Sequence, residues 1–289
     1  MVKIFFSWIL LFTLAVAQEH LENENKAISK PVVTDPLNEK IKSFLSQKTY
    51  EQNRDFINVI FEPKSDYYQN DRVDAVKVVQ TLKENGLLKL FFNSPQEFRL
   101  NFKTNASPLF FVKLMEDTLR NIGYYRYVTT ASTYDASEFV WSINLTSEYI
   151  TDPLVLQNQL RKSSCDIIDI ERNGAKEWSY LIDISHAKLN LIMLHNGEKI
   201  SLKRSLYAHW LNVSKIRMLK IKSSRRNSWY PKIAYYDASL HLVKLLVREK
   251  IYREILLKIP KNAIYIKISD AYSMKNLRDE LELIPQGSR

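Results

Sequence analysis

The spacing of apolar positions changes three times, in the same order, between residues 71 and 185. In each cycle a helical spacing of three to four residues gives way to the alternation of strands. Helix starts are expected at Asp71 or Asp74, at Ser107-Pro108 and at Asp152-Pro153, since a capping side chain or an early proline favours helix initiation. The strands expected to follow are LLKLFF and EFRLNFKT, then YYRYVTTASTY and SEFVWSINLTSEY, then CDIIDIER and KEWSYLIDIS.

A short phrase recurs at the end of the first two helices. Residues 81–90 read TLKENGLLKL and residues 118–127 read TLRNIGYYRY, an offset of 37 residues. This offset lies in the range of repeated supersecondary units. Gly86 and Gly123 are the expected left-handed residues just past each helix. A weaker copy, QLRKSS, ends the third helix. The pattern predicts tandem α-β-β modules over residues 71–185.

The segments on either side of residues 71–185 have different patterns of apolar and polar positions. Residues 18–70 are interpreted as a leader without periodicity to about residue 34, a helix from Asp35-Pro36, and a second helix capped by Thr49 and ended by Pro63. Residues 186–289 alternate as short strands and predict a β-sandwich. Residues 241–250 fit a strand or a helix, and both stay open. The predicted fold class is therefore α+β.

The N-terminus has the features of an export signal. Lys3 precedes a short apolar stretch, and Ala15 and Ala17 are the small residues that a signal peptidase reads. We expect residues 1–17 to be removed and the mature protein to be periplasmic, without a transmembrane anchor; an uncleaved anchor helix is the alternative. Cys165 is the single cysteine, and its apolar neighbours predict a buried thiol.

Charge is distributed unequally along the chain. The formal net charge is +10, yet residues 187–289 hold 21 Lys and Arg against 8 Asp and Glu. Such asymmetry indicates an anionic or acidic partner for the C-terminal part. Because the protein is expected to be exported, nucleic acid is not an expected partner. The expected partners are envelope proteins, with an anionic glycan or a lipid headgroup surface as a further class.

One constellation stands above the background. Residues 199–232 contain ten basic groups and no Asp or Glu, with aromatic residues between them. Arginine pairs bind carboxylate or phosphate bidentately, and Trp or Tyr rings stack on sugars or apolar faces. The candidate binding residues are Lys203, Arg204, Lys220, Lys222, Arg225, Arg226, Trp229 and Tyr230. The alternative is a solvated basic face in which Trp210 and Trp229 fill the core.

Patterns that carry catalysis are missing from the sequence. It has no G-x-S-x-G, H-E-x-x-H, G-x-x-x-x-G-K or G-x-G-x-x-G, and its five histidines are scattered. Ser185 and Lys188 match S-x-x-K, but the match follows a strand and no K-T-G accompanies it. We therefore predict no catalytic residues, no metal site and no cofactor.

The chain resembles known proteins in three respects. The helix–glycine–strand order of residues 71–185 resembles small periplasmic modules of the POTRA, secretin N-domain and BON kind, which implies protein docking by strand addition. The order KIRMLKI, SRRNSWYPKIAYYD and AIYIKISD resembles galactose-binding-like, discoidin-type sandwiches over about residues 195–289, which implies ligands at the loops. The whole chain is similar to exported proteins of the Campylobacter and Helicobacter kind. The hypothesis is a non-catalytic scaffold of an envelope machine such as the flagellar motor or a secretion apparatus; the alternative is a protein that binds or processes envelope glycans.

Overall fold

A computed structural model describes residues 35–135 and 137–289, so the predicted signal 1–17 and the leader up to residue 34 lie outside the described residues. The chain divides into two units, with the boundary between Glu39 and Lys40. The described residues contain helices and several sheets, which confirms the α+β class. None of their helices has the length and apolar character required to span a membrane.

The first described segment is helical. Its elements are α1 (Pro36–Phe44), α2 (Gln47–Gln52), α3 (Arg54–Ile60) and the 3-10 helix η1 (Lys64–Tyr67), followed by the short pair β1 (Tyr68–Gln69) and β2 (Arg72–Val73). Asp35 accepts a hydrogen bond from the backbone N–H of Leu37 (3.1 Å), as a capping residue should. The predicted second helix is instead two helices, and Ser46, not Thr49, caps the first of them.

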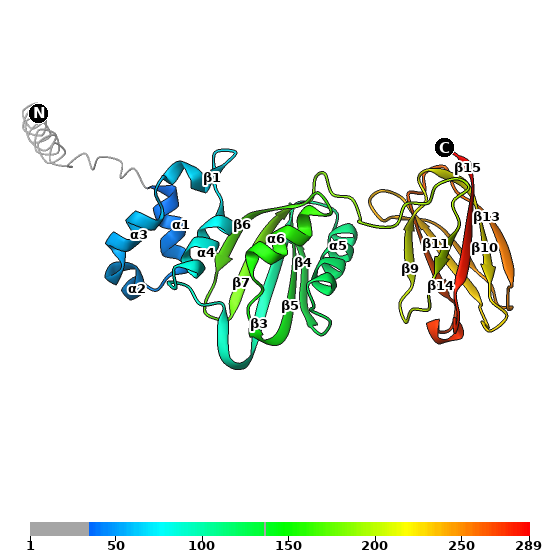
Figure 1. The fold of residues 1–289 in the computed structure, drawn as a ribbon, viewed down its shortest axis with the longest axis horizontal. Coiled ribbons are helices and arrows are strands. Elements are labelled where there is room, and N and C mark those ends of the chain that lie inside the picture. The colour runs from blue at the N-terminus through cyan, green and yellow to red at the C-terminus, as the bar shows by residue number, and fades with distance from the viewer. Residues whose placement is uncertain (1–34, 136) are drawn as a thin grey trace, which may run out of the picture. The chain divides into compact units, whose positions relative to one another are not determined.

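Residues 91–183 contribute one five-stranded sheet. Its strands are β3 (Phe91–Thr104), β4 (Val128–Asp135), β5 (Glu138–Tyr149), β6 (Asp166–Arg172) and β7 (Glu177–Asp183), in the order β4-β5-β3-β7-β6. Central β3 pairs antiparallel with β5 and parallel with β7. The three predicted α-β-β units therefore share one sheet and do not form separate modules (Figure 1).

The first predicted strand pair differs in a specific way. The structure has one strand, β3, with a register shift between Phe91 and Gln96, where two strands were expected. The residues expected to begin the first strand close the preceding helix, since the N–H groups of Leu87 and Leu88 both bond to the carbonyl of Leu82 (2.9 and 3.1 Å). Backbone that satisfies the orphan carbonyls of a helix end is not available to a sheet ladder.

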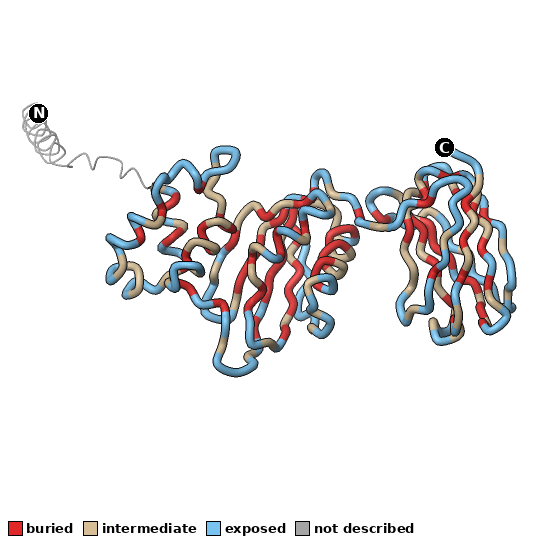
Figure 2. Tube along the Cα trace, viewed as in Figure 1, coloured by how far each residue is buried: buried red, intermediate tan, exposed pale blue. Residues whose placement is uncertain are grey.

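Three helices cross one face of this sheet (Figure 1). They are α4 (Ala75–Glu84), α5 (Pro108–Asn121) and α6 (Pro153–Arg161). Asp74 and Asp152 cap α4 and α6 through the N–H groups of Lys77 (3.0 Å) and Leu154 (2.9 Å). The sheet contributes the large buried side chains Phe98, Leu100, Phe102, Trp178 and Tyr180. Figure 2 shows buried positions along the strands of this sheet.

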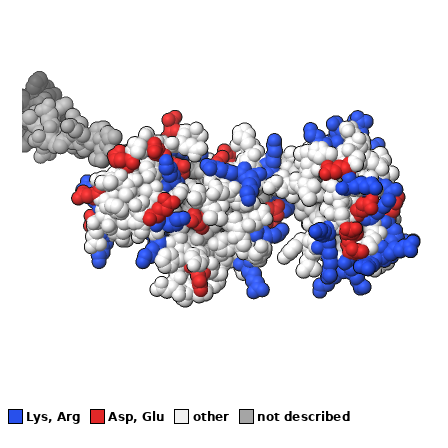
Figure 3. Space-filling model, in the orientation of Figure 1, with Lys and Arg blue, Asp and Glu red and all other residues white. Residues whose placement is uncertain are grey.

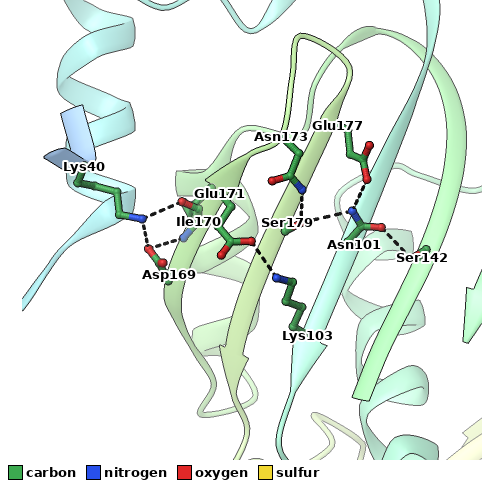
Figure 4. A network of polar contacts seen from close by, with 10 residues as sticks. All are labelled: Lys40, Asn101, Lys103, Ser142, Asp169, Ile170, Glu171, Asn173, Glu177 and Ser179. Atoms are coloured by element: carbon green, nitrogen blue, oxygen red, sulfur yellow. Dashed lines mark hydrogen bonds and ion pairs between the residues drawn. The ribbon is translucent and has the colours of Figure 1, made fainter. Parts of the chain in front are cut away.

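The opposite face of the sheet is polar (Figure 4). Asn101 donates to Glu177 (2.9 Å) and accepts from the hydroxyl of Ser142 (2.7 Å). Asn173 donates to Ser179 (2.7 Å) on the neighbouring strand. The buried polar groups Asn101, Ser142 and Ser179 on this face are therefore all hydrogen-bonded, as buried polar groups generally are.

The C-terminal part is a sandwich of two four-stranded antiparallel sheets, ordered β13-β10-β15-β8 and β12-β11-β14-β9. The strands are β8 (Ile200–Leu202), β9 (His209–Asn212), β10 (Ile216–Ser223), β11 (Pro231–Tyr236), β12 (Leu242–Val247), β13 (Glu254–Lys258), β14 (Tyr265–Asp270) and β15 (Leu281–Ser288). Residues 241–250 thus contain a strand. The expected strand KLNLIML is reduced to an isolated bridge between Met193 and Asn212.

Candidate binding surfaces

The loops of the sandwich bring much of the predicted basic set together. Leu202 ends β8 and Ser223 ends β10, and both pair with Leu281 of β15. The loops that follow these two strands therefore leave the sandwich at the same end. They carry four of the predicted residues, all exposed: Lys203, Arg204, Arg225 and Arg226.

Two further loops add bases that the sequence reading did not include. The β12–β13 and β14–β15 connections emerge beside the first two, because Arg248 bonds to the carbonyl of Pro231 (2.9 Å) and Ser228 bonds to the carbonyl of Asn276 (3.0 Å). We call the combined surface the basic loop end. It comprises Lys203, Arg204, Arg225, Arg226, Arg248, Lys250, Lys275 and Arg278. None of these eight forms an ion pair within the described residues.

Two predicted bases lie elsewhere and are compensated. Lys220 and Lys222 project from β10 away from the core, and the Nζ of Lys220 lies 2.7 Å from Glu254 Oε1. Lys222 is opposite Glu254 on one side and Glu282 on the other. The run without acids along the chain thus acquires carboxylates from neighbouring strands, and carboxylates stand among the bases on the visible face of the sandwich (Figure 3). We remove Lys220 and Lys222 from the candidate set.

The predicted stacking residue Trp229 is also corrected. Its side chain is completely buried in the sandwich core, and its Nε1 donates to the carbonyl of Ser269 (3.0 Å). An indole enclosed in this way cannot stack on a ligand. Trp210 is not in that core; it stacks on Tyr236 with ring centroids 5.0 Å apart.

Tyr207 and Tyr272 are exposed aromatic side chains of these loops, at 63% and 67%, and Tyr272 is the one that contacts Tyr230. Tyr230 meets it edge to face, with ring centroids 4.9 Å apart and planes at 87°. The sequence reading found Tyr230 but missed Tyr272, because the two are distant along the chain and no local motif joins them.

Buried polar side chains fix the loops. Asp270 accepts hydrogen bonds from the N–H groups of Tyr230 (2.8 Å), Tyr272 (2.9 Å) and Ser273 (2.8 Å) and from the amide of Asn276 (3.0 Å). Asn227, also buried, accepts from the N–H of Asp279 (2.7 Å) and donates to the carbonyl of Glu280 (3.1 Å). The loops are thereby preorganised, which lowers the entropy cost of binding.

The same loops also carry three carboxylates, Glu249, Asp279 and Glu280, of which Asp279 interacts with Arg226. Hydrogen bonds from Ser224 and from the Glu280 N–H, together with the charge of Arg226, lower the pKa of Asp279. Asp279 is therefore ionised at neutral pH. Ser224 lies 2.8 Å from its Oδ2 and holds it inside the loop.

A second candidate surface belongs to the five-stranded sheet and its helices. An open cavity of about 500 Å³ lies where α4 meets β3, where α5 meets β4 and where β5 meets α6. We call it the junction cavity. Its lining is mainly apolar and includes Leu88, Leu90, Phe91, Ile122, Tyr124, Tyr149, Ile150 and Val155. Both copies of the repeated phrase contribute to this list, so the repeat surrounds the cavity as well as ending the helices.

Polar groups are few in the junction cavity. The Nζ of Lys83 forms an ion pair with Asp152 (2.6 Å) on its wall. Burial raises the pKa of the Tyr124 phenol; the Thr151 hydroxyl offsets part of this, and the charge of Asp152 adds to it. Thr151 Oγ1 is buried and makes no hydrogen bond of standard geometry within the described residues. The cavity therefore suits an apolar group better than a charged one.

No protein-family model matches the chain, and a search of curated proteins finds no match either. Within residues 35–135 and 137–289, no three His, Cys, Asp or Glu side chains gather in a way that would hold a metal ion.

Proposed function

We propose that this protein is an exported, periplasmic, non-catalytic interaction protein that serves as an accessory scaffold of an envelope machine such as the flagellar motor or a secretion apparatus. The observation that carries the proposal is the basic loop end. Eight exposed bases lie on four loops at one end of a sandwich, without ion pairs among the described residues. Such a surface attracts an acidic partner and fixes its orientation.

The junction cavity supports a protein as that partner. Interfaces combine a desolvated apolar anchor with a polar surround, and aromatic and Arg side chains dominate their binding energy. Phe91, Tyr149 and Val155 are exposed around the cavity and present an apolar rim. A partner with an acidic face and an exposed apolar side chain matches both surfaces.

Charge reversal tests the proposal. The double variant Arg225→Glu/Arg226→Glu removes positive charge from loops that Asp270 and Asn227 hold in place, so the fold is retained. The matched control is Lys215→Glu/Lys261→Glu, two exposed lysines at the opposite end of the same sandwich. A photocrosslinking amino acid at Tyr272 reports on the loop end in intact cells.

The expected result is one discrete crosslinked envelope protein that disappears in the Arg225/Arg226 variant and persists in the control. Because the contact is electrostatic, recovery of the complex falls as salt rises. Equal crosslinking in both variants would refute the proposal.

A second candidate is favoured by one observation. Tyr272 is exposed beside Tyr230 and the Arg225–Arg226 loop, an aromatic platform next to cationic side chains that suits an anionic envelope glycan. If purified protein binds soluble peptidoglycan fragments or lipopolysaccharide, and Tyr272→Ala abolishes that binding while no protein crosslinks, the glycan function replaces the scaffold function.

A further inference from the structure

The two edges of the five-stranded sheet differ in protection. Edge strand β6 carries four charged residues in seven and a register shift between Ile167 and Asp169. The Nζ of Lys40 also bonds to the carbonyl of Ile170 (3.1 Å) and pairs with Asp169 (2.5 Å), which occupies the backbone of that edge (Figure 4). Charges, bulges and covering side chains are the devices that prevent edge-to-edge pairing.

Edge strand β4 shares the bulge, with a register shift between Thr129 and Ala131, but it lacks the charges and the covering side chain of β6. All eight of its residues are exposed, and from Val128 to Tyr134 it contains no charge, no proline and no glycine. Its one partner strand among the described residues is β5. Its outer backbone groups are therefore free to pair with another extended strand, a common mode of recognition.

The charges near the two ends of β4 indicate which strand would pair with its outer edge. Asp135 stands directly opposite Glu138 on β5, and like charges in opposed positions are destabilising. Arg126, two residues before the other end of β4, is exposed and has no ion pair within the described residues. Suppose that β4 of a second copy runs antiparallel to β4 of the first, with the two-fold axis between residues 130 and 131. Arg126 of each chain then lies opposite Asp135 of the other chain.

The bulge of β4 makes this register consistent. Thr129 pairs with Ile143 and Ala131 with Ser142, so one extra residue interrupts the alternation of faces. Thr129 and Ser132 consequently face the same side of the sheet, although their positions differ by three, which in a regular strand would place them on opposite sides. In the centred pairing these two are opposite each other, as a sheet requires, whereas an unbulged strand could not satisfy that condition.

We propose that two copies of this chain pair through antiparallel β4 strands and form one continuous ten-stranded sheet about a two-fold axis. Each contact occurs twice, as in any isologous dimer. The interaction uses no residue of the basic loop end, whose charges carry the proposed function, so the two proposals can be tested separately.

Sedimentation equilibrium of the full chain from residue 18 tests the dimer. The variants are Arg126→Asp, Asp135→Arg, the combined Arg126→Asp/Asp135→Arg, and Ala131→Lys, which introduces a protective charge at the centre of the edge. Ser94→Lys, on the exposed segment near the start of β3, is the matched control. Circular dichroism and cooperative thermal unfolding verify that every variant is folded.

We expect a monomer–dimer equilibrium in the parent chain and in the control. Each single charge reversal should weaken the dimer by roughly tenfold, because the altered pair occurs twice. The combined reversal should restore it, and Ala131→Lys should abolish it. A parent chain that is monomeric at submillimolar concentration overturns the proposal, as does a dimer that is unaffected by Ala131→Lys or not restored by the combined reversal.

Discussion

Phe44 stacks on Trp178, with ring centroids 5.9 Å apart and planes inclined by 22°. Both side chains are completely buried. Replacing Phe44 by Ala should lower the free energy of unfolding by about 3–5 kcal/mol, since the change removes a buried ring and leaves a cavity. Urea denaturation measures the loss. Phe56→Ala, at a residue that is 44% exposed, should change stability by only about 0.5 kcal/mol.

Asp152, at the start of α6, makes two stabilising interactions that substitutions can separate. Asp152 both caps the helix and pairs with Lys83. Asp152→Ala should cost about 1–2 kcal/mol because it removes both interactions, whereas Asp152→Asn keeps a capping side chain and Lys83→Met keeps the cap itself. A double-mutant cycle by chemical denaturation isolates the pair. Equal losses for the Ala and Asn variants would show that the cap contributes nothing.

The lone cysteine should be inert in the folded protein. Burial, together with the charges of Asp166 and Asp183, raises the pKa of Cys165 from 9.0 to about 12. The thiol therefore stays neutral in the folded state, and a thiolate-specific reagent such as Ellman's reagent should label it only after denaturation. Rapid labelling of the native protein at pH 8 would contradict its buried position.

The same shift makes stability fall in alkali. Between pH 9 and pH 12 the folded protein keeps a proton that the unfolded chain has released, so the stabilisation is complete below pH 9 and is lost as pH rises towards 12. The slope from this one group is about 1.4 kcal/mol per pH unit. Denaturation curves of the parent and Cys165→Ser should differ by this slope; parallel pH profiles would rule out the contribution.

Substitutions of Trp229 and of Tyr272 should have opposite effects: the first should lower stability, and the second should weaken ligand binding. Trp229→Phe leaves the carbonyl of Ser269 without its indole donor and should cost roughly 1–3 kcal/mol of stability. Binding at the basic loop end should persist, because the indole does not reach the surface. Tyr272→Ala should leave stability within about 0.5 kcal/mol and weaken any ligand that stacks on this end. Thermal unfolding paired with binding to soluble peptidoglycan fragments distinguishes the two.

Local signals in the sequence were sufficient for most elements. Asp74, Asp152 and the two glycines of the repeat act where the helix signals place them, since capping and left-handed backbone depend on nearby residues. The hairpins β4–β5 and β6–β7 follow equally from alternation and turn residues. Which strands share a sheet could not be predicted, because the parallel pairing of Leu100 with Trp178 connects distant parts of the chain.

In the candidate site, too, local features could be predicted from the sequence, whereas features that depend on neighbouring strands could not. The exposed Arg225 and Arg226 were identified because a loop sequence exposes its own charges. Glu254 and Glu282 neutralise the neighbouring lysines from other strands, and only the register reveals them. Trp229 was misassigned because the sequence of a basic loop does not distinguish a tryptophan side chain that points to solvent from one that points into the core.

The mixed pairing of β3 has a consequence for assembly. An antiparallel neighbour, β5, is close along the chain, whereas the parallel neighbour, β7, arrives only after α6 and β6. Pairings between distant segments incur a large loop-closure entropy and form slowly. Until Glu177–Asp183 has been synthesised, β3 remains an open edge on the side where β7 will pair. Folding of the sheet therefore depends on completing this region of the chain, and truncation before β7 should leave an aggregation-prone product.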